Sequence, residues 1–225
     1  MQSGKSKNQI HICKICFNEI KETSFHSIVN LSSICDKCLN SLNPYFKHFE
    51  IDGVKALAIY RYDDVVKKII FQFKGCKDYE LKDVFLSAFK FEILLKFHGY
   101  TIVPLPSSKE SDMERGFNHV EEIFKVLNLP MKKVLFKKFK HKQSDGHFKD
   151  RVNVDKVIGI KNGETLTSKK ILIVDDVCTT GSSIRCAIKL VKKYNPKDIK
   201  ILVISKRDFT DEEVKTIGDS FNVLK

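Results

Sequence analysis

Apolar residues follow two patterns along the chain, short continuous runs and faces with helical spacing. The short runs predict β-strands at Val54–Tyr60, Tyr100–Val103, Lys170–Val174 and Ile199–Ser205. Helical spacing predicts one helix that begins at Asp63 or Asp64 and others over Leu81–Phe97, Gly116–Leu127 and Ser182–Tyr194. Because strands alternate with helices, we expect right-handed crossovers and an α/β fold class with a parallel sheet.

Residues at the ends of the predicted helices support these boundaries. An aspartate, Asp63 or Asp64, can cap the first helix, and Gly75 stands at its end. The second predicted helix closes at Gly99, and Asn43-Pro44 marks a break before the first predicted strand. The apolar face of the first helix comprises Val65, Val66, Ile69, Ile70 and Phe73.

The length of 225 residues, with 42% hydrophobic and 30% charged content, suffices for one large domain together with a small module. We expect a polar leader at 1–10, a small module at 11–44 and the large domain at 45–225. The longest apolar runs, such as Ile171–Val174, have strand length, so no membrane insertion is expected. The polar start lacks the apolar core of a secretory signal, which predicts a cytoplasmic protein.

Four of the seven cysteines form two pairs of equal spacing, Cys13-x-x-Cys16 and Cys35-x-x-Cys38. An odd number of cysteines without an export signal argues against a disulfide framework. Two residues between thiolates let one turn aim both sulfurs at a tetrahedral ion, and two such turns complete a closed, structural Zn²⁺ site. Ordinary buried cysteines and a redox Cys-x-x-Cys are the weaker interpretations. Residues 11–42 are too few to form a core, so the metal would provide most of their folding free energy.

The segment from Lys170 to Ile184 combines an apolar run, two carboxylates and a turn rich in hydroxyl groups. Asp175 and Asp176 follow the run at the carboxyl edge of the predicted sheet, where open α/β sheets bind ligands. Paired carboxylates suit the vicinal hydroxyls of a ribose. A capped helix after a strand with two incidental acids is the alternative. The turn into the next helix can hold a phosphate on its N–H groups and hydroxyls, and it comprises Thr179, Thr180, Gly181, Ser182 and Ser183.

The run from Val174 to Ser183 resembles the signature of the type I phosphoribosyltransferases. The resemblance implies binding of 5-phosphoribosyl 1-diphosphate (PRPP) with Mg²⁺, with the ribose hydroxyls on Asp175 and Asp176 and the 5-phosphate on the turn from Thr179 to Ser183. A second pair of stretches, Val103–Pro106 and Glu114–Asn118, is similar to the ComF-type bacterial competence proteins. Members of that family join a four-cysteine zinc finger to a phosphoribosyltransferase-like domain, and the resemblance covers nearly the whole chain.

The family resemblance also implies a loop that binds the diphosphate of PRPP. Ser107, Ser108 and Lys109 follow a predicted strand at the ligand-binding edge, and Arg115 offers a second, bidentate contact with phosphate or nucleic acid. A solvated turn is the alternative for the first three residues. In this fold class the loop 140–151 would close over the substrate, and Lys140 stands where relatives usually carry a threonine.

A net charge of +12, from 40 basic against 28 acidic residues, predicts a phosphate-bearing partner. Phe136 and Phe139 interrupt the densest basic segment, and their rings could stack on bases while the ammonium groups follow a phosphate backbone. A solvated basic face with the rings turned inward is the alternative. Neither feature distinguishes DNA from RNA. The candidate lysines are Lys132, Lys133, Lys137, Lys138, Lys140 and Lys142.

Three functions agree with these features. The first is a competence factor for DNA uptake and natural transformation that binds single-stranded DNA and PRPP, with other competence or DNA-import proteins as candidate partners. The second is an active phosphoribosyltransferase with a nucleobase or another nitrogen nucleophile as acceptor, and the third is a binding module without turnover. We expect the first, because the family resemblance and the positive charge support it. For the second, the sequence supplies the phosphate and ribose half of a site but no base-recognition element.

Overall fold

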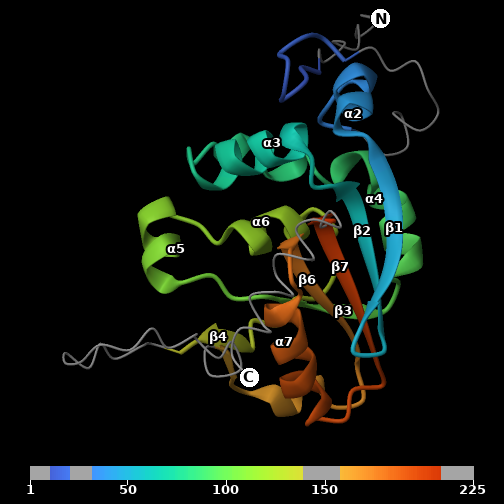
Figure 1. Ribbon diagram of the computed structural model, residues 1–225, viewed down its shortest axis with the longest axis vertical. Helices are drawn as coiled ribbons and strands as arrows, with labels where there is room; N and C mark the ends of the chain where they lie inside the picture. The colour runs from blue at the N-terminus through green and yellow to red at the C-terminus, as the bar shows by residue number, and fades with distance from the viewer. Residues whose placement is uncertain (1–10, 21–31, 139–157, 209–225) are drawn as a thin grey trace, which may run out of the picture.

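A five-stranded sheet lies at the centre of the computed structural model, which describes residues 11–20, 32–138 and 158–208 (Figure 1). The strand order is β1-β2-β7-β6-β3. The last four are mutually parallel, and β1 is an antiparallel edge strand, so the predicted parallel sheet is confirmed. The strands are β1 (Pro44–Ile51), β2 (Val54–Arg61), β3 (Tyr100–Pro104), β6 (Lys170–Cys178) and β7 (Asp198–Lys206).

Helices cover both faces of this sheet (Figure 1). On one face, α3 (Asp64–Lys74) and α6 (His119–Lys125) share a buried core with Leu172 and Val174 of β6. On the other face, α7 (Ser182–Lys192) packs with Ile171 and Ile173, as the two-residue period of a strand requires. The remaining elements are α2 (Asp36–Leu42), η1 (Tyr79–Asp83), η2 (Ser87–Phe89), α4 (Lys90–Lys96), α5 (Lys109–Arg115), β4 (Leu135–Lys137), β5 (Ile158–Ile160) and η4 (Gly163–Leu166).

The first predicted helix is confirmed as α3. The side chain of Asp63 caps it by accepting a hydrogen bond from the backbone N–H of Val66 at 3.0 Å. Val66, Ile69, Ile70 and Phe73 are buried as expected, whereas Val65 is 41% exposed, because it lies at the margin of the apolar stripe.

Two other predicted helices differ from the structure. The range Leu81–Phe97 is broken into η1, η2 and α4, because Val84, Phe85 and Leu86 are all fully buried and a one-sided helix cannot bury three consecutive residues. The helix expected at Gly116–Leu127 begins at His119, since Gly116 instead ends α5 with a positive φ of 82°.

Two strands also differ from the sequence-based expectation. Strand β1 was not predicted, because its exposed positions are charged and its burial is partial, as suits an edge strand. Strand β6 continues to Cys178, so Asp175 and Asp176 lie within the strand and not after it. Hydrogen bonding of β6 to β7 continues past the apolar run and explains this extension.

The cysteine-bearing segments share the main hydrophobic core. Cys13, Ile34, Cys38 and Leu42 belong to the same buried cluster as the residues of α3 and α6. Polar contacts add to this packing, since the Lys14 ammonium lies 2.7 Å from the Asp83 carboxylate. None of the described helices combines the length and apolarity that crossing a membrane requires. The expected polar leader at 1–10 lies outside the described residues.

Candidate functional site

Four cysteine sulfurs converge where the N-terminal segment meets α2. The Sγ atoms of Cys13, Cys16, Cys35 and Cys38 all lie within 4.8 Å of one another, and those of Cys16 and Cys35 are 3.7 Å apart. A tight turn carries the first pair, in which the Phe17 N–H donates to the Cys13 carbonyl at 2.9 Å. Cys35 precedes α2 and Cys38 lies in its first turn, so the helix directs the second pair.

The four thiols of this cluster can all be ionised together only beside a cation. Burial opposes ionisation of Cys13, but backbone N–H groups of Cys16, Cys35 and Ile15 lower the pKa of its thiol to about 7. Burial raises the pKa of Cys38, and the neighbouring sulfurs raise it further. Four adjacent thiolates are therefore stable only around a metal ion. Sulfur ligands in this number fit a closed tetrahedral site with no position left for water.

A turn at the carboxyl end of β6 leads into α7. Gly181 caps α7 in the left-handed region, with φ of 75°, and its hydrogen-only side chain faces Ile51. Thr179, Thr180 and Ser183 are exposed, and the Arg185 guanidinium donates to the Thr180 carbonyl at 2.7 Å. The first backbone N–H groups of an α-helix have no partner within the helix, so this turn presents donors and hydroxyls to solvent.

The two carboxylates of β6 have different surroundings. The Asp176 carboxylate accepts from the Lys74 ammonium at 2.8 Å and lies 3.2 Å from Nε2 of His119. These groups come from α3 and α6 on one face of the sheet. Asp175 is half-buried, and its carboxylate accepts a hydrogen bond from the backbone N–H of Asp176 at 2.9 Å. Within the described chain, Asp175 forms no ion pair, in contrast to Asp176.

This difference separates the pKa values of the pair. Burial and the charge of Asp176 raise the pKa of Asp175 well above its usual range. Burial acts in the same direction on Asp176, but the hydrogen bond with His119 and the charge of Lys74 outweigh it and lower the pKa of Asp176. Asp176 therefore stays ionised, while ionisation of Asp175 is disfavoured until a cation or hydrogen-bond donors approach.

Three of the residues expected at a diphosphate form hydrogen bonds with neighbouring residues of the same turn and helix. The Ser107 hydroxyl donates to Asp112, and the Asn118 amide donates to Ser107 at 3.0 Å. Arg115 is 10% exposed at its side chain and lies 3.0 Å from the Asp112 carboxylate. Ser108 caps α5 by accepting from the Ser111 N–H. This network holds the turn after β3 in shape. It also pairs the Arg115 guanidinium, which was expected to contact phosphate, with Asp112.

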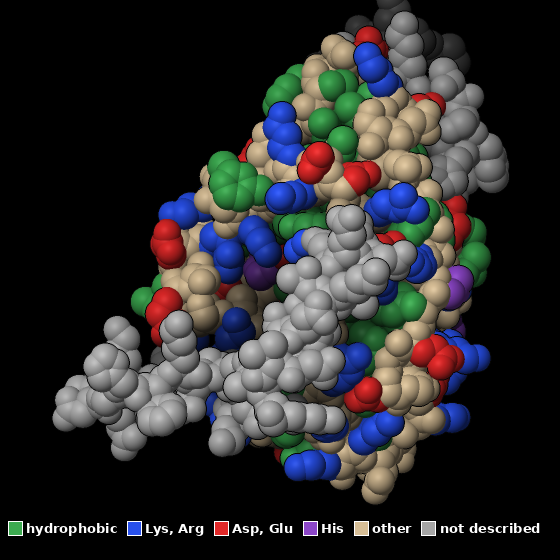
Figure 2. Space-filling model, in the orientation of Figure 1, with side chains coloured by type: hydrophobic (Ala, Val, Ile, Leu, Met, Phe, Trp, Pro, Cys, Tyr) green, Lys and Arg blue, Asp and Glu red, His purple; other side chains and the backbone are tan. Residues whose placement is uncertain are grey.

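A small pocket of about 150 Å³ opens at this turn. The face in Figure 2 is hollowed between α5 and β4, and Lys and Arg side chains gather along the rim. Two of the lysines expected on a nucleic-acid track line this pocket, Lys133 and Lys137, together with Ser107 and Lys109. The structure thus brings some of the diphosphate and nucleic-acid candidates to one place.

The basic segment is only partly available for a polyanion. Lys133 forms an ion pair with Glu121, and Lys132 is half-buried. Lys137 and Lys138 are exposed, whereas Lys140 and Lys142 lie outside the described residues. The Phe136 ring is half-buried, packs against Gly159, where even a methyl group would clash, and lines the small pocket.

Sequence reasoning missed Lys74 and His119. Both are distant from Asp176 along the chain, so no local pattern pairs them with it. The position of His119 directly after a helix-capping asparagine, Asn118, is the one local signal, because it places the imidazole at the start of α6. Burial also raises the pKa of the Cys178 thiol, to about 11, which keeps it protonated at neutral pH.

Comparison with known proteins shows which families this chain resembles. Residues 113–222 match the family description "Phosphoribosyl transferase domain". The chain is 33% identical to Competence protein ComFC of Streptococcus pneumoniae over 148 residues, which are 66% of each chain. It is 29% identical to Competence protein ComFC of Bacillus subtilis over 134 residues, 59% of this chain and 55% of that one. The chain is similar to the ComF-type competence proteins. The matched region is less than two thirds of the length of either relative.

A solved purine phosphoribosyltransferase from Pyrococcus horikoshii OT3 is 24% identical, with a TM-score of 0.35, over 65% of this chain and 76% of that one. The parallel sheet and the four-cysteine cluster, both expected from the sequence, are confirmed by the structure itself.

Proposed function

We propose that this ComF-type protein binds PRPP with Mg²⁺ at the carboxyl edge of its sheet and acts in DNA uptake and natural transformation in the cytoplasm. The observation that carries the proposal is the adjacency of Asp175 to the turn that Gly181 opens into α7. Vicinal hydroxyls need a carboxylate acceptor, and a phosphate needs N–H donors and a positive helix end. One short segment supplies both groups.

The proposed contacts follow the ligand from one end to the other. The 5-phosphate lies on the turn formed by Thr179, Thr180, Gly181, Ser182 and Ser183. The ribose hydroxyls bind the Asp175 carboxylate. Asp176, the next residue of β6, supports the position of Asp175. The diphosphate lies in the pocket beside Ser107, Ser108 and Lys109, and Arg115 holds that turn in place through Asp112. Mg²⁺ accompanies PRPP and neutralises the diphosphate charge.

We expect Gly181→Ala to weaken PRPP binding at least about tenfold, since alanine disfavours the positive φ and the turn must rotate its N–H donors away from the phosphate. Calorimetry with Mg²⁺-PRPP measures this. Gly99→Ala is the matched control, because Gly99 has φ of 77° and empty space around its Cβ position. Both variants should lose about 1–2 kcal/mol of stability. Equal PRPP affinity in the two variants, or no saturable binding by the unsubstituted protein, would refute the proposed site.

We also propose that the metal in the four-cysteine cluster is a structural Zn²⁺ and that residues 11–44 form its module. The donor set supports this assignment, because four sulfur ligands within 4.8 Å of one another suit a soft tetrahedral ion and exclude Mg²⁺. A closed site has no catalytic position. The ion therefore serves the fold and not the chemistry of the ligand edge.

Single-stranded DNA is the proposed macromolecular partner, with other competence or DNA-import proteins beyond it. The names of the two ComFC relatives support the process, and the exposed lysines Lys137 and Lys138 support the contact. They adjoin the rim of the hollow in Figure 2, so a strand could pass close to the PRPP site. Because the Phe136 ring is half-buried and packs against Gly159, we expect electrostatic attraction to contribute more than base stacking here.

The double substitution Lys137→Glu/Lys138→Glu should reduce affinity for a single-stranded oligonucleotide by at least about tenfold and lower the salt slope by about 1.4, the value for two lost phosphate contacts. Fluorescence anisotropy across a salt series gives both quantities. Lys192→Glu/Lys193→Glu, an equally exposed adjacent pair at the end of α7, is the charge-matched control. Identical losses in the two double variants would mean that net charge alone attracts the oligonucleotide and that β4 provides no contact.

A further inference from the structure

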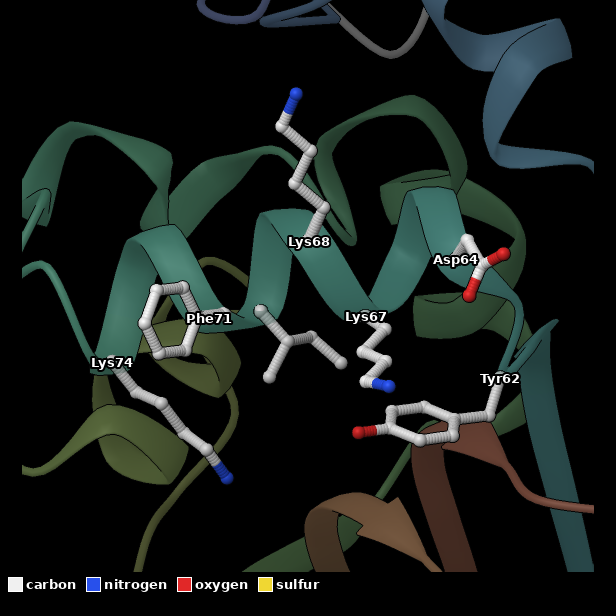
Figure 3. A pocket seen from close by; sticks show the side chains of 7 residues that line it. Tyr62, Asp64, Lys67, Lys68, Phe71 and Lys74 are labelled. Atoms are coloured by element: carbon white, nitrogen blue, oxygen red, sulfur yellow. The ribbon is translucent and has the colours of Figure 1, made fainter.

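A pocket of about 400 Å³ lies beneath α3, beside the carboxyl end of β2 (Figure 3). It differs from the hollow at β4 in position and in residues. Strand β2 is parallel to β7 and β6, so its carboxyl end opens at the same sheet edge as Asp175 and the turn at Gly181. The lining residues are Tyr62, Asp64, Lys67, Lys68, Ile70, Phe71 and Lys74.

Cations dominate the lining. The lining includes three lysines and one acid, Asp64, and Lys68 extends from α3 to the side opposite Lys67 and Lys74 (Figure 3). Lys67 and Lys68 have no ion pair with any residue in the described part of the chain, whereas Lys74 is paired with Asp176. Figure 3 shows Lys67 and Lys74 extending from α3 toward the strand ends, on the same side as Tyr62. A pocket lined by more cations than acids attracts anions.

The pocket also offers apolar surface for a flat ring. Tyr62 and Phe71 contribute aromatic rings, and Ile70 contributes a buried aliphatic side chain. Phe71 is 62% exposed, a large apolar area for a ring on a helix surface. Ligand pockets of a few hundred Å³ combine such apolar walls with a few charged groups that fix orientation. The combination fits a planar ring that carries a negative group.

We propose that this pocket binds the second ligand of the PRPP site and that this ligand is an aromatic anion, with its ring against Tyr62 and Phe71 and its charge on Lys67 and Lys74. The inference rests on the proposed function in one respect, because only a protein that binds PRPP as its first ligand has a second one. A carboxylate on a free aromatic acid and a phosphate on a nucleotide share the required chemistry.

Lys74 connects this pocket to the ribose site. Its ammonium lies 2.8 Å from the Asp176 carboxylate, yet its side chain is 40% exposed and lines the pocket. An anion in the pocket competes with Asp176 for this ammonium. His119 still holds Asp176 when Lys74 turns away, so the carboxylate keeps a donor. Occupation of the pocket and occupation of the ribose site are therefore coupled through one side chain.

Calorimetry on the full chain with two matched pairs of probes tests the proposal. Orotate and uracil differ by a carboxylate, and thymidine 5′-monophosphate (dTMP) and thymidine differ by a phosphate. We expect at least one anionic member to bind about tenfold or more tightly than its neutral partner, as one charge-assisted hydrogen bond predicts. A preference confined to orotate identifies a free aromatic acid, and one confined to dTMP identifies a nucleotide.

Lys67→Met should reduce this preference to threefold or less, because it removes a cation without touching Asp176. Lys96→Met, which removes an exposed lysine from α4, is the matched control and should leave the preference unchanged. The Gly181→Ala variant separates the two proposals, since it should lose PRPP but still bind the anionic probe. Equal binding of charged and neutral probes, no saturable binding of either anion at millimolar concentration, or an unchanged preference in Lys67→Met would overturn the inference.

Discussion

Removing the metal from the four-cysteine site should lower the melting temperature of the whole protein by more than about 10 °C. Structural zinc contributes on the order of 10 kcal/mol to small zinc modules, and 1 kcal/mol shifts the melting temperature of a domain of this size by about 2–4 °C. Cys13 and Cys38 are buried in the same cluster as the residues of α3 and α6. Loss of the metal therefore exposes part of the core that supports the ligand edge, and not only the residues from 11 to 42.

Thermal unfolding with and without a strong chelator measures the effect, together with metal analysis of the purified protein. We expect about one zinc ion per chain. Cys38→Ser should reproduce the chelated state, and Cys76→Ser is the control, because Cys76 is an exposed cysteine outside the cluster. A melting temperature that is insensitive to both the chelator and Cys38→Ser would show that packing alone holds these segments.

The sequence predicted the parts of the fold that depend on local pattern. Buried strands such as Lys170–Val174 appear as continuous apolar runs, and α3 appears through its stripe and its Asp63 cap. It did not predict β1, whose burial depends on pairing with β2, nor the breaks between Leu81 and Phe97, where residues are buried on every side. Both failures have one cause, because tertiary contacts determine those conformations and leave no periodic signal.

The candidate site shows the same division. Cysteine spacing predicted the four-sulfur cluster, and the turn chemistry from Thr179 to Ser183 predicted a helix start with exposed hydroxyls. The partners of Asp176 could not be predicted, because Lys74 and His119 come from two helices that only the folded chain brings together. The same holds for Arg115, whose fork suits phosphate in isolation but is paired with Asp112 in the fold.

Replacing Asp175 with asparagine should stabilise the protein at neutral pH and weaken PRPP binding. Burial and the charge of Asp176 disfavour the ionised form of Asp175, so the neutral amide avoids an electrostatic repulsion that the carboxylate creates. The amide oxygen of asparagine can still accept the hydrogen bond from the backbone N–H of Asp176, so the substitution preserves this bond. We expect a rise in melting temperature of about 2–4 °C, as for a gain of roughly 1 kcal/mol.

The stability difference should depend on pH in a defined direction. A carboxyl whose pKa is higher in the folded state than in the unfolded chain binds more protons when folded, so stability falls as pH rises above about 4, the unfolded value, and through the raised folded pKa. Asp175→Asn removes this fall. Asp176 acts in the opposite sense, since its lowered pKa gives stability that is lost only in acid, and both proteins retain it. The advantage of the variant should therefore be smallest near pH 4 and grow toward neutral pH.

PRPP affinity should change in the other direction, with a loss of about tenfold to a hundredfold, because hydrogen bonds from two ribose hydroxyls to a charged acceptor become bonds to a neutral amide. Thermal unfolding at several pH values and calorimetry with Mg²⁺-PRPP measure the two effects on the same samples. Asp198→Asn, on the opposite end of β7, is a carboxylate control outside the ligand edge. A variant that is less stable than the unsubstituted protein at neutral pH would contradict the electrostatic argument, and unchanged PRPP affinity would remove Asp175 from the ribose site. Stability gained together with binding lost is the result expected of a carboxylate that is kept for a ligand, because only the bound hydroxyls and cation offset its repulsion with Asp176.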